Sequence, residues 1–476
     1  MYAAFTSVAL VGGDVRPVEV QVHVGRQQDQ FKLSGLPDTA VREAKDRVRA
    51  AVMSSGIQFP NRTVTVNLAP AHLPKSGTDF DLPIALGVLA ACREVPMSAR
   101  AVVVGELALD GSVRSGPSTL GAAVLSARDG IPCVVGRASA AAVAAVPGSI
   151  VHPVGTLAEA VQMLQGGIDR AVPAEPEVQA GPGDLPDLAE VKGQAMARRA
   201  VEIAAAGGHH LLFHGPPGGG KTMLARRLAG ILPPLDPSES VEVALLHAAA
   251  GLSRRLTNVR PFRAPHHTAS RAALVGGGSG VATPGEVSLA HRGVLFLDEM
   301  AEFPRGNLDS LRQPLEDGEV TVARRGATAT FPAAFQLVAA TNPCPCGFLG
   351  DHRKACVCRP AAVARYRQRV SGPLLDRFDM VVKVDRLEAT ALDEAPEPTS
   401  RIRDRVATAA ARLRIGEPPV GAEAGAMLAR ALGAGLLTAR GVHRVGRVAT
   451  TLAALSGADE VGDDHVAESM ALRADW

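Results

Sequence analysis

Residues 215–222 constrain this chain more than any other segment, because they run Gly, four residues, then Gly-Lys-Thr. Glycines let a backbone curl so that successive N–H groups point inward at phosphate oxygens. The lysine can then neutralise phosphate charge, and the threonine hydroxyl can bind Mg²⁺. The pattern predicts a loop that binds ATP and Mg²⁺, built from Gly215, Pro216, Pro217, Gly218, Gly219, Gly220, Lys221 and Thr222.

The residues on both sides of this loop fit the strand–loop–helix unit to which such loops belong. Residues 211–213 are apolar and predict a strand, and residues 223–228 predict the helix that follows. The alternative is a glycine-rich turn that matches by chance, and such a turn would not require either flank.

A second element, residues 294–299, joins four apolar residues to Asp298 and Glu299. A continuous apolar run is typical of a strand buried on both faces, as in a parallel sheet. At its end Asp298 could hold Mg²⁺, and Glu299 could orient an attacking water. The alternative is an ordinary core strand that ends in solvated acids. The phosphate loop upstream favours the first interpretation, which makes the protein an ATPase.

Length and composition limit the number of domains, the kind of partner and the cellular location that we expect. A chain of 476 residues is too long for one compact core, and three domains are the expectation. The formal net charge is +2, so any surface for nucleic acid would have to be local. The start of the chain lacks the basic region of a signal peptide, and no apolar run is long enough to span a membrane. We therefore expect a cytoplasmic protein without a membrane partner.

Composition and periodicity predict an α/β protein that consists of several domains. In the first region residues 18–24 alternate as a half-buried strand, and residues 64–68 form another. A helix is expected after Asp38 as N-cap, with one apolar face. The predicted units are an α+β domain at 1–165, a linker rich in Pro and Gly at 166–186, an ATPase core with a parallel sheet at 187–385, and a helical lid domain at 386–476.

Four further segments carry a resemblance to a known family. They are residues 261–268 (PFRAPHHT), 285–293 (GEVSLAHRG), 341–347 (TNPCPCG) and 371–379 (SGPLLDRFD). Together with the phosphate loop, they resemble the magnesium-chelatase-like AAA+ ATPases of the ComM/YifB type, over nearly the whole chain. The resemblance implies a ring, usually a hexamer, with ATP held between neighbouring subunits.

The resemblance also implies roles for three further residues. Asn342 matches the sensor-1 position, where a polar side chain helps to place the attacking water. Arg377 matches an arginine finger that reaches the adjacent subunit's ATP, where a guanidinium can stabilise charge on the transferred phosphoryl group. For Arg377 the alternative is a surface ion pair with Asp376 or Asp379. Arg440 matches the sensor-2 arginine of the lid, although Arg444 and Arg447 on the same predicted helix compete for that role.

Residues 319–331 predict a β-hairpin with a basic tip, because two alternating runs flank Arg324-Arg325-Gly326. In related ring helicases a hairpin at this place points into the central pore. Arg324 and Arg325 would then bind the phosphate backbone of DNA, single-stranded or branched, without reading its sequence. The alternative is a solvated turn.

The N-terminal domain resembles the peptidase domain of Lon-type proteases, with a ribosomal S5 domain 2-like α+β fold. The family's serine position falls near Asp79 and its lysine position near Ala122. A serine nucleophile needs the lysine that activates it. Adjacent residues in an extended segment point opposite ways, so Lys75 and Ser76 do not replace the pair. We expect a domain without proteolytic activity.

Four cysteines, Cys344, Cys346, Cys356 and Cys358, bracket a short loop. Four thiolates could complete a tetrahedral zinc site and hold a loop too short for its own core. The alternative is a set of reduced thiols in a polar loop.

Two classes of function remain open. The first is a ring-forming, ATP-dependent DNA motor, which by the resemblance drives branch migration or unwinding in recombination or transformation. The second is a motor without protease activity that remodels protein or acts as a chelatase does. The basic hairpin favours DNA.

Overall fold

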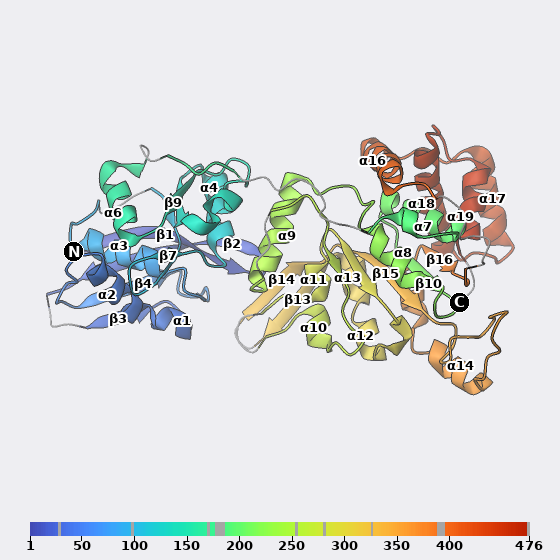
Figure 1. Ribbon diagram of the computed structural model, residues 1–476, viewed down its shortest axis with the longest axis horizontal. Coiled ribbons are helices and arrows are strands. Elements are labelled where there is room, and N and C mark those ends of the chain that lie inside the picture. Colours follow the sequence, from blue (N-terminus) through green and yellow to red (C-terminus); the bar gives the residue numbers. More distant parts are fainter. Residues whose placement is uncertain are drawn as a thin grey trace.

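The computed structural model describes residues 1–26, 30–96, 100–168, 172–176, 186–252, 256–278, 282–324, 327–387 and 396–473. Three bodies follow one another along the long axis of the molecule, and the chain visits them in sequence order (Figure 1). The mixed α/β class, the parallel sheet and the helical C-terminal region are as predicted.

The N-terminal body is built on a seven-stranded mixed sheet in the order β3-β4-β2-β1-β5-β8-β9. Its centre is the antiparallel pair of β1 and β2, which runs in register from Tyr2↔His23 to Val11↔Asp14. The strands are β1 (Tyr2–Val11), β2 (Asp14–Val24), β3 (Phe31–Ser34), β4 (Val64–Ala69), β5 (Val102–Val103), β8 (Cys133–Gly136) and β9 (Val151–Val154), and β6 (Glu106–Leu107) pairs with β7 (Val113–Arg114).

Helices of this body cover the sheet. Every residue of α3 is buried, which makes it the central helix of the domain. The helices are α1 (Thr39–Arg42), α2 (Ala44–Ser54), α3 (Asp81–Ala91), α4 (Thr119–Asp129), α5 (Arg137–Val143) and α6 (Leu157–Gly166). Asp38 caps α1 by accepting from the Val41 amide at 2.8 Å, as predicted. The single expected helix is divided at Glu43 into α1 and α2, although its apolar face stays buried across the break.

The middle body holds a five-stranded, entirely parallel sheet in the order β11-β12-β15-β10-β16. Its strands are β11 (Phe262–Arg263), β12 (Val294–Leu297), β15 (Gln336–Thr341), β10 (Leu211–His214) and β16 (Met380–Lys383). Both faces carry a hydrophobic cluster, which explains why β10, β12 and β15 are continuous apolar runs.

Helices flank this sheet, and the described ones of four residues or more are α7 (Ala195–Gly207), α8 (Lys221–Leu228), α9 (Pro237–Ala249), α10 (Arg271–Val275), α11 (Glu286–Leu289), α12 (Arg305–Asp309), α13 (Arg312–Asp317), α14 (Pro360–Arg367) and α15 (Gly372–Leu375). The antiparallel hairpin of β13 (Glu319–Arg324) and β14 (Ala327–Pro332) lies apart from the main sheet. Figure 1 shows it on the side of the core that faces the N-terminal body.

The C-terminal body consists of α16 (Thr399–Ile415), α17 (Ala422–Gly433), α18 (Ala439–Ser456) and α19 (Asp463–Ala471). Side chains of α16 and α18 share a hydrophobic cluster with α7, so this bundle is seated on the sheet (Figure 1). No helix in the described part of the chain is long and apolar enough to cross a membrane.

Among the described residues, the N-terminal body touches the core at α9 and at β14. Ala244 and Leu245 of α9 enter a cluster with residues of β8 and α4. The β1–β2 turn, Gly12–Gly13, rests on β14: a Cβ on Gly12 would lie 2.8 Å from the Thr330 carbonyl oxygen. The predicted linker falls between the two bodies, and in its described part the Ala174 amide donates to the Val151 carbonyl at 2.7 Å.

Candidate nucleotide site

The predicted phosphate loop joins β10 to α8 at the carboxyl edge of the parallel sheet. Gly218 and Gly220 have φ of 81° and 92°, a region where a side chain would be strained. Gly215 has a second reason to be glycine, because a Cβ there would lie 2.0 Å from the Val384 carbonyl oxygen. The loop lines a cavity of about 420 Å³ together with Asp298, Glu299, Asn342 and their neighbours. The structure thus gathers at one edge the residues that the sequence predicts for ATP.

Lys221 is buried at the base of this cavity, 9% exposed. Its ammonium donates to the carbonyls of Gly215 and Pro216 at 2.7 and 2.9 Å and to Asn342 Oδ1 at 3.2 Å. Burial lowers its pKa to about 8, although the carboxylates of Asp298 and Glu299 act in the opposite direction. A cation held this way, short of anionic partners, is suited to receive phosphate oxygens.

Thr222 and Asp298 have the geometry of two magnesium ligands. The Thr222 hydroxyl donates to Asp298 Oδ2 at 2.8 Å. Neighbouring ligands of an octahedral Mg²⁺, each about 2.1 Å from the ion, lie roughly 3 Å apart. The donor set therefore fits Mg²⁺, which would neutralise phosphate charge where these two oxygens meet the nucleotide.

Glu299 follows Asp298 with φ of 50°, in the left-handed region, and its amide donates to Asp298 Oδ1 at 3.0 Å. This unusual backbone turns the side chain out of the strand direction, and the carboxylate is 56% exposed at the cavity. Asn342 follows β15 on the same edge, where its amide oxygen accepts from Lys221. Glu299 and Asn342 are thus placed to act on a water beside the phosphates.

His267 is a candidate residue that the sequence reasoning missed. Its Nδ1 lies 3.5 Å from Glu299 Oε2. The ring stacks on His266 with centroids 4.1 Å apart and meets Phe303 edge-on at 6.4 Å. The paired histidines after β11 were the available signal, but their spacing from Glu299 along the chain gives no hint of the contact.

Arg377 lies at the opposite edge of the sheet from the phosphate loop. It precedes β16, whose residues pair in parallel with β10, so Arg377 is at the amino edge and Gly215 at the carboxyl edge. The side chain is 12% exposed and pairs with Glu316. An ion pair does exist, as the alternative interpretation held, but its partner is Glu316 rather than Asp376 or Asp379.

Arg440, at the second position of α18, lies beside Arg377. The two side chains line a cavity of about 490 Å³ with Glu316, Ala439, His443 and Arg444. Burial and the nearby charges of Arg440 and Arg312 lower the pKa of Arg377. The competitors of Arg440 are engaged with the protein: Arg444 donates to the Phe378 carbonyl at 3.0 Å and Arg447 lies 3.6 Å from Asp379. Arg440 is 73% exposed.

The predicted hairpin is present as β13 and β14, in register from Glu319↔Pro332 to Arg324↔Ala327. Its base is anchored in the core through Val320, Val322 and Phe331. Arg324 ends β13, and Arg325 lies outside the described residues.

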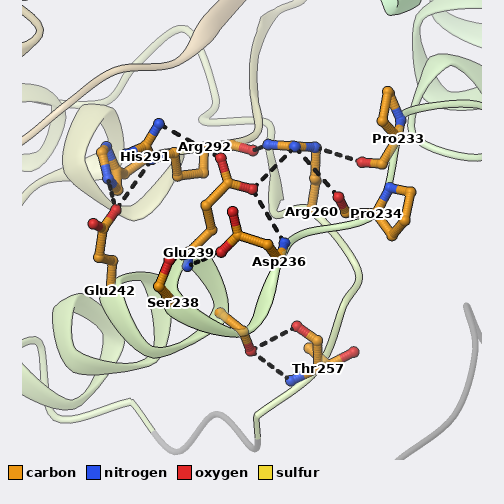
Figure 2. Close-up of polar contacts among 11 residues, drawn as sticks. Pro233, Pro234, Asp236, Ser238, Glu239, Glu242, Thr257, Arg260, His291 and Arg292 are labelled. Carbon is orange, nitrogen blue, oxygen red and sulfur yellow. Dashed lines mark hydrogen bonds and ion pairs between the residues drawn. The ribbon is translucent and has the colours of Figure 1, made fainter. Parts of the chain in front are cut away.

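The end of the segment 285–293 makes structural contacts, and Figure 2 shows those of His291 and Arg292 with Glu242 and Arg260. His291 Nδ1 accepts from the Ala334 amide at 3.1 Å, and its Nε2 lies 3.2 Å from Glu242. Arg292 reaches the same carboxylate at 3.1 Å, and its carbonyl accepts from Arg260 at 2.7 Å. These contacts tie α9, which meets the N-terminal body, to the start of β12.

In the N-terminal body the positions of the expected protease pair are both buried. Asp79 is 1% exposed, where burial raises its pKa, and Ala122 is fully buried. Lys75 is buried and donates to the Pro70 carbonyl, whereas Ser76 is exposed. The described residues bring no serine and lysine together here.

The four cysteines converge, with Sγ atoms that all lie within 4.8 Å of one another. Three of the separations are 3.4, 3.6 and 3.7 Å.

Comparison with known proteins shows the family to which the chain belongs. The family model "Magnesium chelatase, subunit ChlI" matches residues 187–392, and its C-terminal model matches residues 401–473. The model "Subunit ChlI of Mg-chelatase" matches residues 18–137. The chain is 39% identical to the competence protein ComM of Haemophilus influenzae, over 98% of this chain and 96% of that protein. The chain belongs to the magnesium-chelatase-like ComM/YifB family.

Other members are similarly close. An uncharacterized protein of Mycobacterium tuberculosis is 45% identical over 98% of this chain and 97% of its own length. The uncharacterized protein YifB of Escherichia coli is 40% identical over 79% of this chain and 74% of its own length. Membership and the cavity at the phosphate loop make this protein a chelatase-like AAA+ ATPase.

Proposed function

We propose that this ATPase is a ring-forming motor that moves on DNA and drives branch migration or unwinding in recombination or transformation. The observation that carries the proposal is the β13–β14 hairpin, which combines an apolar base fixed in the core with Arg324 at the end of β13; Arg325 follows it in the sequence. A rigid element with a basic end can press on a phosphate backbone without reading bases.

The hairpin also has a route to the nucleotide. The strand that follows β14 is β15, and Asn342 at its end contacts the ammonium of Lys221. Movement of Asn342 during hydrolysis would therefore pass along one strand to the hairpin base. A motor needs such a connection between the site that hydrolyses ATP and the element that contacts DNA.

The arrangement of residues at the two edges of the sheet supports a ring. Arg377 and Arg440 lie at the edge away from the chain's own phosphate loop, so they cannot serve its nucleotide. The partly desolvated guanidinium of Arg377 and the exposed one of Arg440 lie beside an open cavity, where they suit the phosphates of a neighbouring subunit. We propose a closed ring, a hexamer as in related ATPases, in which each nucleotide lies between two chains.

Charge beyond the hairpin supports a nucleic acid. Between residues 343 and 375 the only carboxylate is Asp351, in a protein whose net charge is only +2. Exposed cations of this stretch include Arg353, Lys354, Arg359 and Arg365. In addition, one relative bears the name competence protein, a term that refers to uptake of DNA.

The test measures DNA binding and DNA-stimulated ATPase activity of the full chain. We expect the wild type to bind single-stranded and forked DNA at low salt. Changing Arg324 and Arg325 to alanine should weaken binding to all sequences and reduce the salt dependence by roughly one unit of slope per lost contact with duplex DNA. Basal ATPase activity should remain, while stimulation by DNA is lost.

The matched control changes Lys32 and Lys45, two exposed lysines of the N-terminal body, to alanine. This control removes the same charge and should keep the wild-type salt slope. A hairpin variant that still moves branched DNA normally would exclude the hairpin. A wild type that binds no DNA at low salt would favour the second candidate, a motor that remodels protein or acts as a chelatase does, as the family model's description suggests.

A further inference from the structure

The loop 344–358, here called the cysteine loop, connects the nucleotide site to α14 without a core of its own. None of its described residues enters one of the hydrophobic clusters of the protein. Val357 at its far end is 84% exposed. A segment of this kind needs another source of order, because fixing each residue costs about 1–2 kcal/mol of backbone entropy.

The four thiols have the spacing of a tetrahedral metal site. Zinc binds thiolate sulfur at about 2.3 Å, and the edge of such a tetrahedron is roughly 3.8 Å. The three closest Sγ separations, 3.4 to 3.7 Å, approach that edge. They are far from the length of about 2.05 Å of a disulfide bond, and all four cysteines are free.

The surroundings favour an anionic metal cluster. A Zn²⁺ ion with four thiolates carries a net charge of −2, and Arg353, Lys354 and Arg359 flank the ligands. The Cys358 amide donates to Cys356 Sγ at 3.4 Å, a contact that supports a thiolate. Arg386 holds the loop from outside, 3.1 Å from Asp351.

The cysteine loop is seated on the phosphate loop. Cys344 follows Asn342 by two residues, and Gly347 has φ of 83°. A Cβ on Gly347 would lie 2.7 Å from Pro217 Cδ and 3.9 Å from Asn342 Cγ. The fold of the cysteine loop therefore sets the packing on one side of Pro217 and Asn342.

We propose that Cys344, Cys346, Cys356 and Cys358 bind one structural Zn²⁺, which holds the cysteine loop against Pro217 and Asn342 of the nucleotide site. The metal takes no part in hydrolysis. Binding exchanges the thiol protons for Zn²⁺ without oxidation, so the site requires reduced cysteines.

The first test is metal analysis of full-length protein purified without chelators or added metal. We expect one zinc per chain, released as the thiols are titrated with a mercurial. Changing Cys356 and Cys358 together to serine should abolish zinc binding. The control Cys92→Ser, a free cysteine of the N-terminal body, should keep it. Protein without zinc and with four freely reactive thiols would overturn the proposal, as would stoichiometric iron in place of zinc.

A second test covers the case in which the double variant does not fold. Wild-type protein in which Co²⁺ replaces the native metal should show the intense visible absorption of a tetrahedral cobalt–thiolate site. Trypsin should cleave after Arg353 or Lys354 only after a chelator has removed the metal. Binding of a fluorescent ATP analogue should weaken in the same chelated sample. Equal cleavage and equal binding before and after chelation would show that no metal orders this loop, whatever the substrate of the motor.

Discussion

Lys221 and Glu299 line the same cavity, but their environments assign them different tasks. The ammonium of Lys221 is buried and donates hydrogen bonds to two carbonyls and the Asn342 amide, all of which are neutral. An anion such as a phosphate would stabilise its charge further. The Glu299 carboxylate is more than half exposed, and among the described residues no hydrogen bond joins it to Lys221. We therefore propose that Lys221 serves nucleotide binding and Glu299 serves hydrolysis.

We expect Lys221→Ala to abolish ATP binding and Glu299→Gln to keep it. Glutamine preserves the shape of Glu299 but cannot act as a base, so turnover should fall by roughly 10²–10⁴-fold while the nucleotide stays bound. Equilibrium binding of a fluorescent ATP analogue and steady-state phosphate release measure the two effects. Hydrolysis by Glu299→Gln at the wild-type rate would remove Glu299 from the water-positioning role.

His267 should affect the rate without affecting affinity, because it contacts Glu299 rather than the phosphate loop. We expect His267→Ala to lower kcat roughly ten-fold, since a carboxylate that is no longer oriented loses part of what a base contributes. His267→Asn, which can still hydrogen-bond, should recover part of that loss. An unchanged kcat in His267→Ala, measured at saturating ATP, would show that the contact has no role in turnover.

At the scale of elements, the sequence predicted what local pattern controls. The alternation of apolar and polar residues predicted β2 and β4, and Asp38 as N-cap predicted the start of α1. The glycine-rich motif predicted the turn between β10 and α8. Arg377's partner Glu316 and the approach of His267 to Glu299 escaped prediction, because each joins residues far apart in the chain. The order of strands in the sheet is equally nonlocal.

Two glycines with similar backbone angles allow the cost of a strained backbone to be distinguished from the cost of a steric clash. Gly12 has φ of 65° and Gly56 has φ of 76°, but only at Gly12 would a Cβ meet a backbone oxygen, that of Thr330. Each alanine variant should lose roughly 1–2 kcal/mol from the left-handed backbone. Gly12→Ala should lose more, because β14 must also move. Denaturation midpoints compare the two variants, and equal midpoints would mean that the β1–β2 turn does not press on β14.

A histidine between β10 and β15 should make stability depend on pH. His210 Nδ1 accepts from the Leu337 amide at 3.0 Å, and burial lowers the pKa of His210 to about 4. In the unfolded chain a histidine titrates near 6.5, so between pH 6.5 and 4 the unfolded state binds more protons. Acidification through this window should therefore destabilise the fold, by at most about 1.4 kcal/mol per pH unit from this group.

Urea unfolding at pH 7 and pH 5 measures this dependence. His210→Gln should reduce this dependence without removing it, because burial also lowers the pKa of His214 to about 4. The exposed His72→Gln serves as the matched control that should leave the dependence unchanged. A His210→Gln variant with the full wild-type pH dependence would assign the effect to other groups.

On the scale of the whole molecule, one chain carries the two halves of the proposed composite site at opposite edges of its sheet. The phosphate loop, Asp298 and Glu299 lie at the carboxyl edge, and Arg377 with Arg440 lies at the amino edge. The sequence motifs predicted both halves, but only the three-dimensional order of the strands separates them. The proposed ring unites the halves of neighbouring chains.

Mixing two inactive variants tests this arrangement. Arg377→Ala alone should lower kcat by roughly 10³-fold or more, as loss of an arginine finger does. Glu299→Gln alone should be inactive as well. In an equimolar mixture about one quarter of the interfaces would pair an intact Glu299 with an intact Arg377, so ATPase activity should return. A mixture as inactive as its components, or full activity of pure Arg377→Ala, would place Arg377 outside the active site.

The separation of the two edges has a consequence for how the enzyme responds to its own abundance. In the proposed ring, a solitary chain would bind ATP but would lack its neighbour's guanidinium groups, which complete the site. Turnover per chain should then fall on dilution below the dissociation constant of the assembly, although each molecule remains folded and loaded with nucleotide. Dilution would therefore lower ATP turnover without unfolding the protein. A cell that makes few copies of it would hold it as single chains that bind ATP but do not hydrolyse it.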